Sequence, residues 1–199
     1  MTGVSRSALI AFLDAEFPTY PNPSAISIWR KGRDAFEAGD LKRAEMFVAM
    51  NRMVNNSEIP ATVRIGKGTK FAYGGGGVIV HKDAVIGKRC SIGSQVTISG
   101  LCSEIGDDVY LATGSKLVGP CRIGSASIVG ANSVVTTDVE SLSVVAGSPA
   151  KKISRITLDT LRKYQAYFNY KGSRELEKEF ADRYRDLMYR DAVQIDLPA

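Results

Sequence analysis

Large apolar residues return at every sixth position between Ile65 and Val135, with two short interruptions. A strand alternates with a period of two and a helix repeats about every 3.6 residues, so this period fits neither. These core positions are Ile65, Phe71, Val80, Ile86, Ile92, Ile98, Ile105, Leu111, Leu117, Ile123, Val129 and Val135. The pattern predicts a solenoid in which each six-residue unit forms one short strand and one corner.

A second series of compact side chains supports the same interpretation. They stand four residues after the core positions, at Thr69, Ala84, Cys90, Val96, Cys102, Val109, Ser115, Cys121, Ser127, Ser133 and Val139. Gly directly follows six core positions, at Gly66, Gly87, Gly93, Gly106, Gly124 and Gly130. Three such units close a triangular coil with the large residue inside, and coils of about eighteen residues stack into a prism.

Helical spacing of apolar residues predicts helices on both sides of this solenoid. Residues 7–17, 24–38 and 40–54 are expected to form helices that cover its first coil. After a loop at residues 147–151, helices are expected over 157–170 and 173–190, with Thr157 and Ser173 as N-caps. Their apolar stripe, expected to pack on the prism or on a neighbouring subunit, is Leu161, Tyr164, Phe168, Leu176, Phe180, Tyr184 and Leu187.

Composition narrows the class of protein. The 199 residues are 44% hydrophobic, and no apolar run is long enough for a membrane span or an export signal, so we expect a cytoplasmic protein. All three cysteines occupy compact corner positions, which favours structural thiols. The net charge of +5 suits an anionic partner, yet no nucleic-acid-binding motif is present, and a phosphate-bearing cofactor would use the same positive field.

The stretch GVIVHKDAVIGKRCSIGSQVTISG, together with IGDDVYLATGSKLVG and IGSASIVGANSVVTTDV, closely resembles the hexapeptide-repeat acyltransferases of the serine acetyltransferase-like branch. The resemblance covers roughly residues 60 to 155. It implies a mainly β fold, a left-handed parallel β-helix with N-terminal and C-terminal α-helical segments, over domains 1–58, 59–155 and 156–199. It also implies a homotrimer that binds acetyl-CoA in grooves between neighbouring prisms, which agrees with the closed symmetry that parallel prisms favour.

His81 is the single histidine of the chain and stands directly after a core position, where Gly is usual. Acetyl transfer to a hydroxyl needs a base that works near neutrality, so His81 is our candidate general base, with Asp83 as a residue that orients the imidazole. Serine acetyltransferases carry an Asp-His pair that aligns instead with Tyr73 and Gly74. His81 therefore either acts from a shifted position, or another base or none is present.

The remaining candidates follow from the resemblance. Cofactor-binding residues are expected at Thr113, Ala131, Pro149, Lys151 and Lys152, where small side chains admit the pantetheine and the lysines meet phosphates. The acceptor is expected near Tyr73, Gly74, Gly75, Gly76, Gly77 and Gln95, with the glycine amides as oxyanion donors.

Three functions follow as alternatives. The main prediction is an acetyl-CoA-dependent O-acetyltransferase that acts on a sugar or a surface-glycan precursor, because the helical N-terminal part is short and the Asp-His pair is missing. A serine O-acetyltransferase and a non-catalytic binding or assembly module are the alternatives. No metal is expected, since a zinc site resembling that of the γ-carbonic anhydrases needs three imidazoles.

Overall fold

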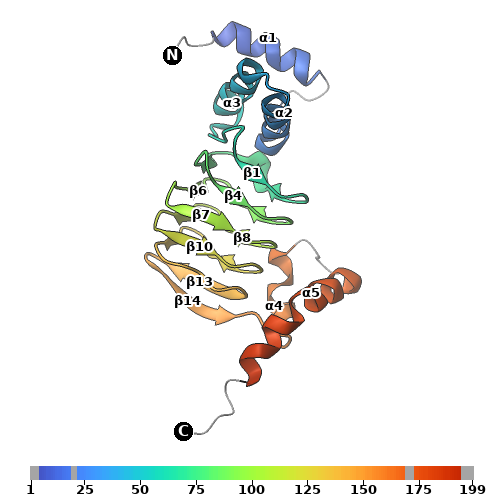
Figure 1. The fold of residues 1–199 in the computed structure, drawn as a ribbon, viewed down its shortest axis with the longest axis vertical. Helices are drawn as coiled ribbons and strands as arrows, with labels where there is room; N and C mark the ends of the chain where they lie inside the picture. Colours follow the sequence, from blue (N-terminus) through green and yellow to red (C-terminus); the bar gives the residue numbers. More distant parts are fainter. Residues whose placement is uncertain (1–4, 19–21, 169–172, 194–199) are drawn as a thin grey trace.

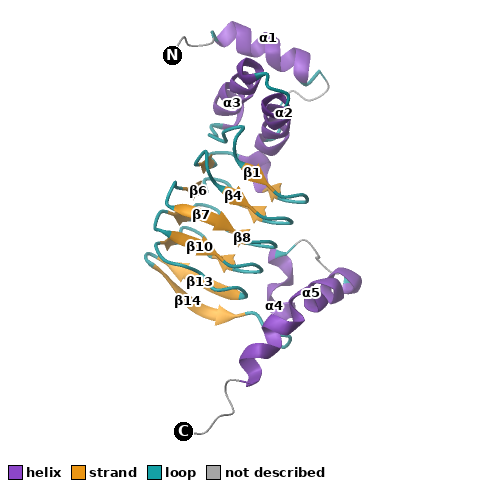
Figure 2. Ribbon diagram, in the orientation of Figure 1, coloured by secondary structure: helices purple, strands orange, loops and turns teal. Residues whose placement is uncertain are grey.

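The computed structural model describes residues 5–18, 22–168 and 173–193. Helices α1 (Arg6–Glu16), α2 (Ala25–Glu37) and α3 (Leu41–Asn55) lie at one end of a stack of strands, and α4 (Leu161–Tyr164) and α5 (Arg174–Val193) lie beside its other end (Figures 1 and 2). The first three match the predicted helices to within a residue at each end. Ser5 and Asp40 cap α1 and α3 by accepting the backbone N–H of Ala8 and Arg43.

The strands between these helices are short and repeat in threes. They are β1 (Arg64–Ile65), β2 (Lys70–Phe71), β3 (Ile79–Val80), β4 (Val85–Ile86), β5 (Ser91–Ile92), β6 (Thr97–Ile98), β7 (Cys102–Ile105), β8 (Tyr110–Leu111), β9 (Lys116–Leu117), β10 (Cys121–Ile123), β11 (Ile128–Val129), β12 (Val134–Val135), β13 (Ser143–Gly147) and β14 (Ala150–Arg155). Within the described residues they form three sheets: face A (β3, β6, β9, β12), face B (β1, β4, β7, β10) and face C (β2, β5, β8, β11, β13, β14). The predicted left-handed parallel β-helix is confirmed.

The core of the prism consists of the residues that the six-residue period selected. Every core position from Phe71 to Val135 is buried in one cluster, whereas Ile65, in the first coil, is only partly buried. The three cysteines are buried in the same cluster, as predicted from their corner positions. Burial raises the pKa of the Cys90 thiol to about 12, so this sulfur is a neutral packing group near neutrality.

The end of the β-helix differs from the prediction. A loop was expected at residues 147–151, but the chain turns back at once and residues 150–155 form β14, which pairs antiparallel with β13 and covers the last edge of face C. The helix expected from Thr157 begins only at Leu161, because Thr157 and Thr160 exchange backbone N–H to hydroxyl bonds at 2.8 and 3.3 Å and form a turn. A short 3-10 helix, η2 (Gln165–Tyr167), follows α4, and the end of the predicted helix at 169–170 lies outside the described residues.

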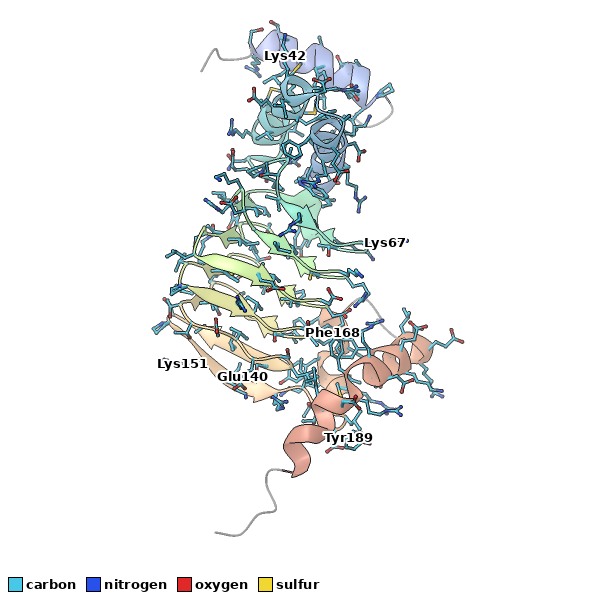
Figure 3. All side chains as sticks on the ribbon, viewed as in Figure 1. Lys42, Lys67, Glu140, Lys151, Phe168 and Tyr189 are labelled. Atoms are coloured by element: carbon cyan, nitrogen blue, oxygen red, sulfur yellow. The ribbon has the colours of Figure 1, made fainter. Side chains whose placement is uncertain are left out.

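The C-terminal helices pack on face C. Buried residues of the helical side are Leu161, Tyr164, Phe168, Phe180, Tyr184 and Met188, and those of the prism are Ala126, Ile128, Leu142, Val144 and Ile156. Phe168 lies where the two groups meet (Figure 3). The expected apolar stripe therefore covers the prism, except for Leu176, which is 42% exposed. No helix in the described parts of the chain is long and apolar enough to cross a membrane.

Asp108 fixes α5 to the corner that precedes β8. Its carboxylate accepts hydrogen bonds from Arg89 Nε at 2.8 Å, from the Tyr184 hydroxyl at 2.6 Å and from Arg183 Nη1 at 3.2 Å. Burial, followed by this carboxylate, raises the pKa of Tyr184. A buried carboxylate with these partners specifies where the helix docks.

Candidate functional site

The corners between face C and face A stack into one continuous edge, which we call the ridge. Its loops are residues 74–77, 93–96, 112–115 and 130–133, and the turn at 147–150, which joins two strands of face C, stacks next to the last of them. Backbone N–H groups join successive loops: Gln95 to Gly76 O at 2.8 Å, Gly114 to Ser94 O at 2.9 Å and Asn132 to Thr113 O at 3.0 Å. The structure thus aligns most of the sequence-predicted acceptor residues with Thr113 and Ala131.

The glycine loop at the start of the ridge is bound to the N-terminal helices. Tyr73, Gly74, Gly75 and Gly77 all have positive φ values, between 50° and 82°. The Gly77 N–H donates to Asn55 O at 2.9 Å, and the Ser57 hydroxyl donates to Gly75 O at 2.7 Å. The Gly77 amide is therefore engaged and cannot serve as the expected oxyanion donor, whereas Tyr73, which is 87% exposed, projects from the same loop.

A groove of about 430 Å³ runs beside the ridge, between face C and the segment formed by α4 and η2. It is lined by Tyr110, Ala112, Thr113, Ile128, Gly130, Ala131, Val144, Val145, Ala146, Ile153, Lys163, Tyr164 and Tyr167. Thr113 and Ala131, predicted to contact the cofactor, thus lie together in a largely apolar groove. Lys163 and Tyr167 could not be predicted as lining residues, because only the docking of α4 and η2 brings them there.

Lys151 and Lys152, also predicted to contact the cofactor, do not line this groove. Both line a separate hollow of about 280 Å³ at the open end of the prism, and Figure 3 places Lys151 on the side of the β-helix away from Phe168. Lys152 Nζ lies 2.8 Å from Glu140 Oε2, and this hydrogen bond lowers the pKa of Glu140. Pro149 lies in the turn between β13 and β14, outside both linings.

His81 lies on the opposite edge of face A, where the chain passes to face B. Its backbone N–H donates to Ile98 O at 2.9 Å, and its side chain is 41% exposed. A Cβ added at Gly100 would lie 3.0 Å from the imidazole Cδ2 and Nε2, so the ring lies over this glycine. The absence of a side chain at Gly100, in the next coil, leaves room for the imidazole.

Asp83 is close to His81 without a hydrogen bond between the two side chains. Nδ1 lies 3.7 Å from Asp83 Oδ2, and the Asp83 N–H approaches Nδ1 at 3.4 Å. The same carboxylate lies 3.2 Å from Lys82 Nζ. Asp83 is therefore placed to attract a protonated imidazole, and it is shared with the lysine.

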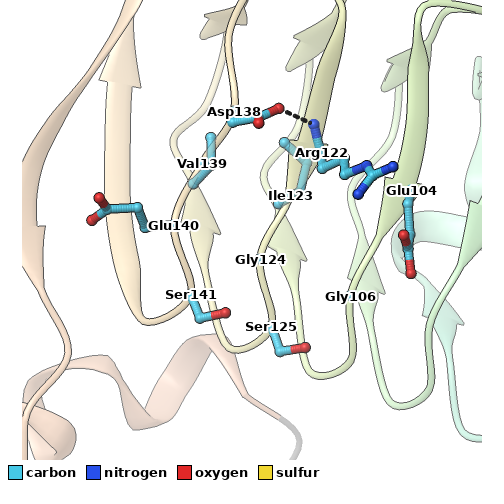
Figure 4. A pocket seen from close by; sticks show the side chains of 10 residues that line it. All are labelled: Glu104, Gly106, Arg122, Ile123, Gly124, Ser125, Asp138, Val139, Glu140 and Ser141. Carbon is cyan, nitrogen blue, oxygen red and sulfur yellow. Dashed lines mark hydrogen bonds between the residues drawn. The ribbon is translucent and has the colours of Figure 1, made fainter. Parts of the chain in front are cut away.

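A further groove of about 450 Å³ crosses face B (Figure 4). Its polar lining is Glu104, Arg122, Ser125, Asp138, Glu140 and Ser141, and the Arg122 N–H donates to Asp138 Oδ1 at 2.8 Å. None of the sequence-predicted site residues lies in this lining. Within the described segments, no group of three or more His, Cys, Asp or Glu side chains is arranged to hold a metal ion.

Comparison with known proteins agrees with this fold. Residues 102–137 match the family described as Bacterial transferase hexapeptide (six repeats). Serine acetyltransferase from Bacillus licheniformis is 30% identical over 158 residues, which cover 73% of this chain and 69% of that protein. Serine acetyltransferase 4 from Arabidopsis thaliana is 36% identical over 158 residues, which cover 75% of this chain and 42% of the relative.

A solved structure extends the comparison to three dimensions. Soybean serine acetyltransferase complexed with serine superposes with a TM-score of 0.59 at 29% identity, over 74% of this chain and 69% of that chain. The chain belongs to the hexapeptide-repeat acyltransferases, in their serine acetyltransferase-like branch. It spans 42% of the Arabidopsis relative and 69% of the Bacillus relative, so part of each relative has no counterpart in the match.

Proposed function

We propose that the protein is an acetyl-CoA-dependent O-acetyltransferase whose acceptor is the hydroxyl of serine. The names of the relatives and the serine-bound soybean structure support this acceptor. They do not support the saccharide acceptor that was our main prediction, and they favour the alternative stated beside it.

The observation that carries the proposal is the placement of two kinds of group on the two edges of face A. The ridge offers small side chains beside an apolar groove, as a pantetheine arm requires, and the other edge offers an exposed imidazole. Four residues of extended chain, from Gly77 to His81, span roughly 13 Å. A thioester at the ridge is therefore out of reach of His81 in its own chain.

A homotrimer of parallel prisms resolves this separation. The edge of one prism that carries His81 would face the ridge of the next prism, and closed symmetry repeats the arrangement three times. Tyr73 and Gln95, on the ridge near the glycine loop, would then contact the acceptor held by His81 of the neighbouring chain.

The chemistry needs one base and no acyl-enzyme. The His81 imidazole takes the serine hydroxyl proton as the oxygen attacks the thioester carbonyl, and Asp83 stabilises the imidazolium that forms. The tetrahedral intermediate then collapses, the C–S bond breaks, and the leaving thiolate receives the proton from the imidazolium. O-acetylserine and CoA are released, and the base returns to its neutral state.

The experiment that tests this function measures acetyl-CoA-dependent release of free thiol with serine and with a panel of sugars as acceptors. Turnover with serine that falls on replacement of His81 by Ala supports the proposal. Turnover with sugars alone would return the acceptor to the saccharide class. A chain with no turnover and no CoA binding would instead be a binding or assembly module.

A further inference from the structure

The groove beside the ridge has two unlike walls, and one of them belongs to the C-terminal helices. The prism wall carries short side chains, at Ala112, Thr113, Ala131 and Ala146. A Cβ added at Gly130 would lie 2.9 Å from the Ala146 Cβ, so only a glycine fits at this point of the wall. A ligand in the groove can therefore approach the backbone of the ridge loops directly.

The helical wall carries aromatic rings and a cation. The Tyr110 and Tyr167 ring centroids are 5.0 Å apart with an interplanar angle of 67°, which fixes Tyr167 over face C. Tyr164 is buried behind it, and Lys163 Nζ lies 5.4 Å from the Tyr164 ring centroid. Tyr167 itself keeps 41% of its surface exposed, and it faces the groove that it lines.

Lys163 is also the charged residue among the described residues that line the groove. The lysines that the sequence suggested for the phosphates line the hollow at the prism end instead, where Lys152 is paired with Glu140. A phosphate that reaches this groove therefore meets the ammonium of Lys163.

We infer that α4 and η2 form the outer wall of the CoA site. Tyr167 covers the pantetheine arm of CoA, and Lys163 binds the CoA phosphates. This inference rests on the proposed function. A pantetheine arm is a thin chain of methylenes and two amides, which suits a narrow groove with an apolar floor and accessible ridge backbone. The diphosphate at one end suits a lysine at the rim, and the thioester end passes over the ridge at Thr113 toward face A.

The test is the affinity for CoA, measured by isothermal titration calorimetry on the full chain. Lys163→Ala and Tyr167→Ala should each raise the Kd for CoA by about tenfold, because each removes one contact with the ligand. Tyr167→Phe keeps the ring and should bind CoA as the unaltered chain does. Lys178→Ala removes an exposed lysine of α5 outside the groove and is the matched control.

A second ligand separates the two roles. Pantetheine lacks the phosphates, so its own Kd, measured by the same calorimetry, should rise with Tyr167→Ala and stay unchanged with Lys163→Ala. Circular dichroism of each variant checks that the fold is retained. If Tyr167→Ala fails to fold, the affinities of Lys163→Ala for CoA and for pantetheine still decide the inference.

The outcomes distinguish this inference from the proposed function. If the unaltered chain binds no CoA, the proposed function is wrong. If it binds CoA and the affinities of Lys163→Ala and Tyr167→Ala equal that of Lys178→Ala, the function stands and the helical wall takes no part in the site.

Discussion

The two edges that border face A are built on different plans. On the ridge, successive loops repeat the same backbone hydrogen bond, and their side chains are mostly small. On the other edge, each coil presents a different residue, including His81, the 61% exposed Leu101 and Pro120. A regular edge gives a groove of constant shape, which suits a long ligand. An irregular edge can hold one reactive group at one place.

The largest expected effect is on the edge that carries His81. His81→Ala should lower kcat by about 10² to 10⁴, because it removes the general base and leaves binding at the ridge intact. Steady-state kinetics with acetyl-CoA and serine measure the change. Lys67→Ala, an exposed lysine on a corner between faces B and C, is the control. A kcat for His81→Ala equal to that of this control would remove His81 from the reaction.

A substitution in the ridge should instead change the affinity for CoA. Ala131→Trp places an indole in the groove and should raise the Kd for CoA by about 100-fold through steric exclusion. Calorimetry measures this Kd, and Ala15→Trp, at an exposed position of α1 outside the lining, is the matched control. Similar affinities in the two variants would show that CoA binds elsewhere.

Substitutions in the glycine loop test how the N-terminal helical segment holds the start of the ridge in place. A Cβ at Gly75 would lie 2.8 Å from the Ala25 Cβ and 2.9 Å from Phe71 Cδ2, at a φ of 82°. Gly75→Ala should therefore cost about 2 to 4 kcal/mol of the free energy of unfolding. At Gly74, φ is 73° but the nearest atom would be 3.9 Å away, so Gly74→Ala should cost only about 1 kcal/mol.

Urea unfolding at one protein concentration measures both losses, because an oligomer's stability depends on concentration. Equal losses for Gly74→Ala and Gly75→Ala would mean that the contact with the helical segment does not constrain the loop.

A smaller effect than that of Gly75→Ala concerns the attachment of α5. Tyr184→Phe removes a 2.6 Å hydrogen bond to Asp108 and should lower stability by about 1 to 2 kcal/mol. Thermal unfolding measures it, with Tyr189→Phe, at a 53% exposed position of the same helix, as the control. A Tyr184→Phe variant as stable as the control would show that Asp108 holds α5 through Arg183 and not through Tyr184.

The β-helix could be predicted because its information is local and repeated. Core positions from Phe71 to Val135, such as Ile92 and Leu117, are set by the six-residue period, and their burial confirms them. Strand β14 falls outside that period and pairs antiparallel, so its sequence, AKKISR, has no repeat to reveal it. The start of α4 was misplaced because Thr157 and Thr160 can both cap a helix, and only their mutual hydrogen bonds decide between them.

The candidate site could be predicted only in part, for a similar reason. His81 is visible as an exception to the repeat, and Thr113 and Ala131 follow from the resemblance. Lys163 and Tyr167 lie more than thirty residues after Ala131 in the chain, and they reach the groove only because α4 and η2 dock on face C. No local pattern encodes this docking. Lys152 likewise lines the other hollow because β14 pairs antiparallel with β13, outside the repeat.

The central claim is that one active site combines His81 of one chain with the ridge of the next. It is tested most directly by mixing His81→Ala and Ala131→Trp chains, by co-expression or by refolding together, and measuring serine acetylation at limiting acetyl-CoA. Each variant alone should be nearly inactive. In random mixed trimers, about a quarter of the sites pair an intact His81 with an intact neighbouring ridge, so about a quarter of the activity should return. A mixture no more active than its separate parents would contradict the shared site.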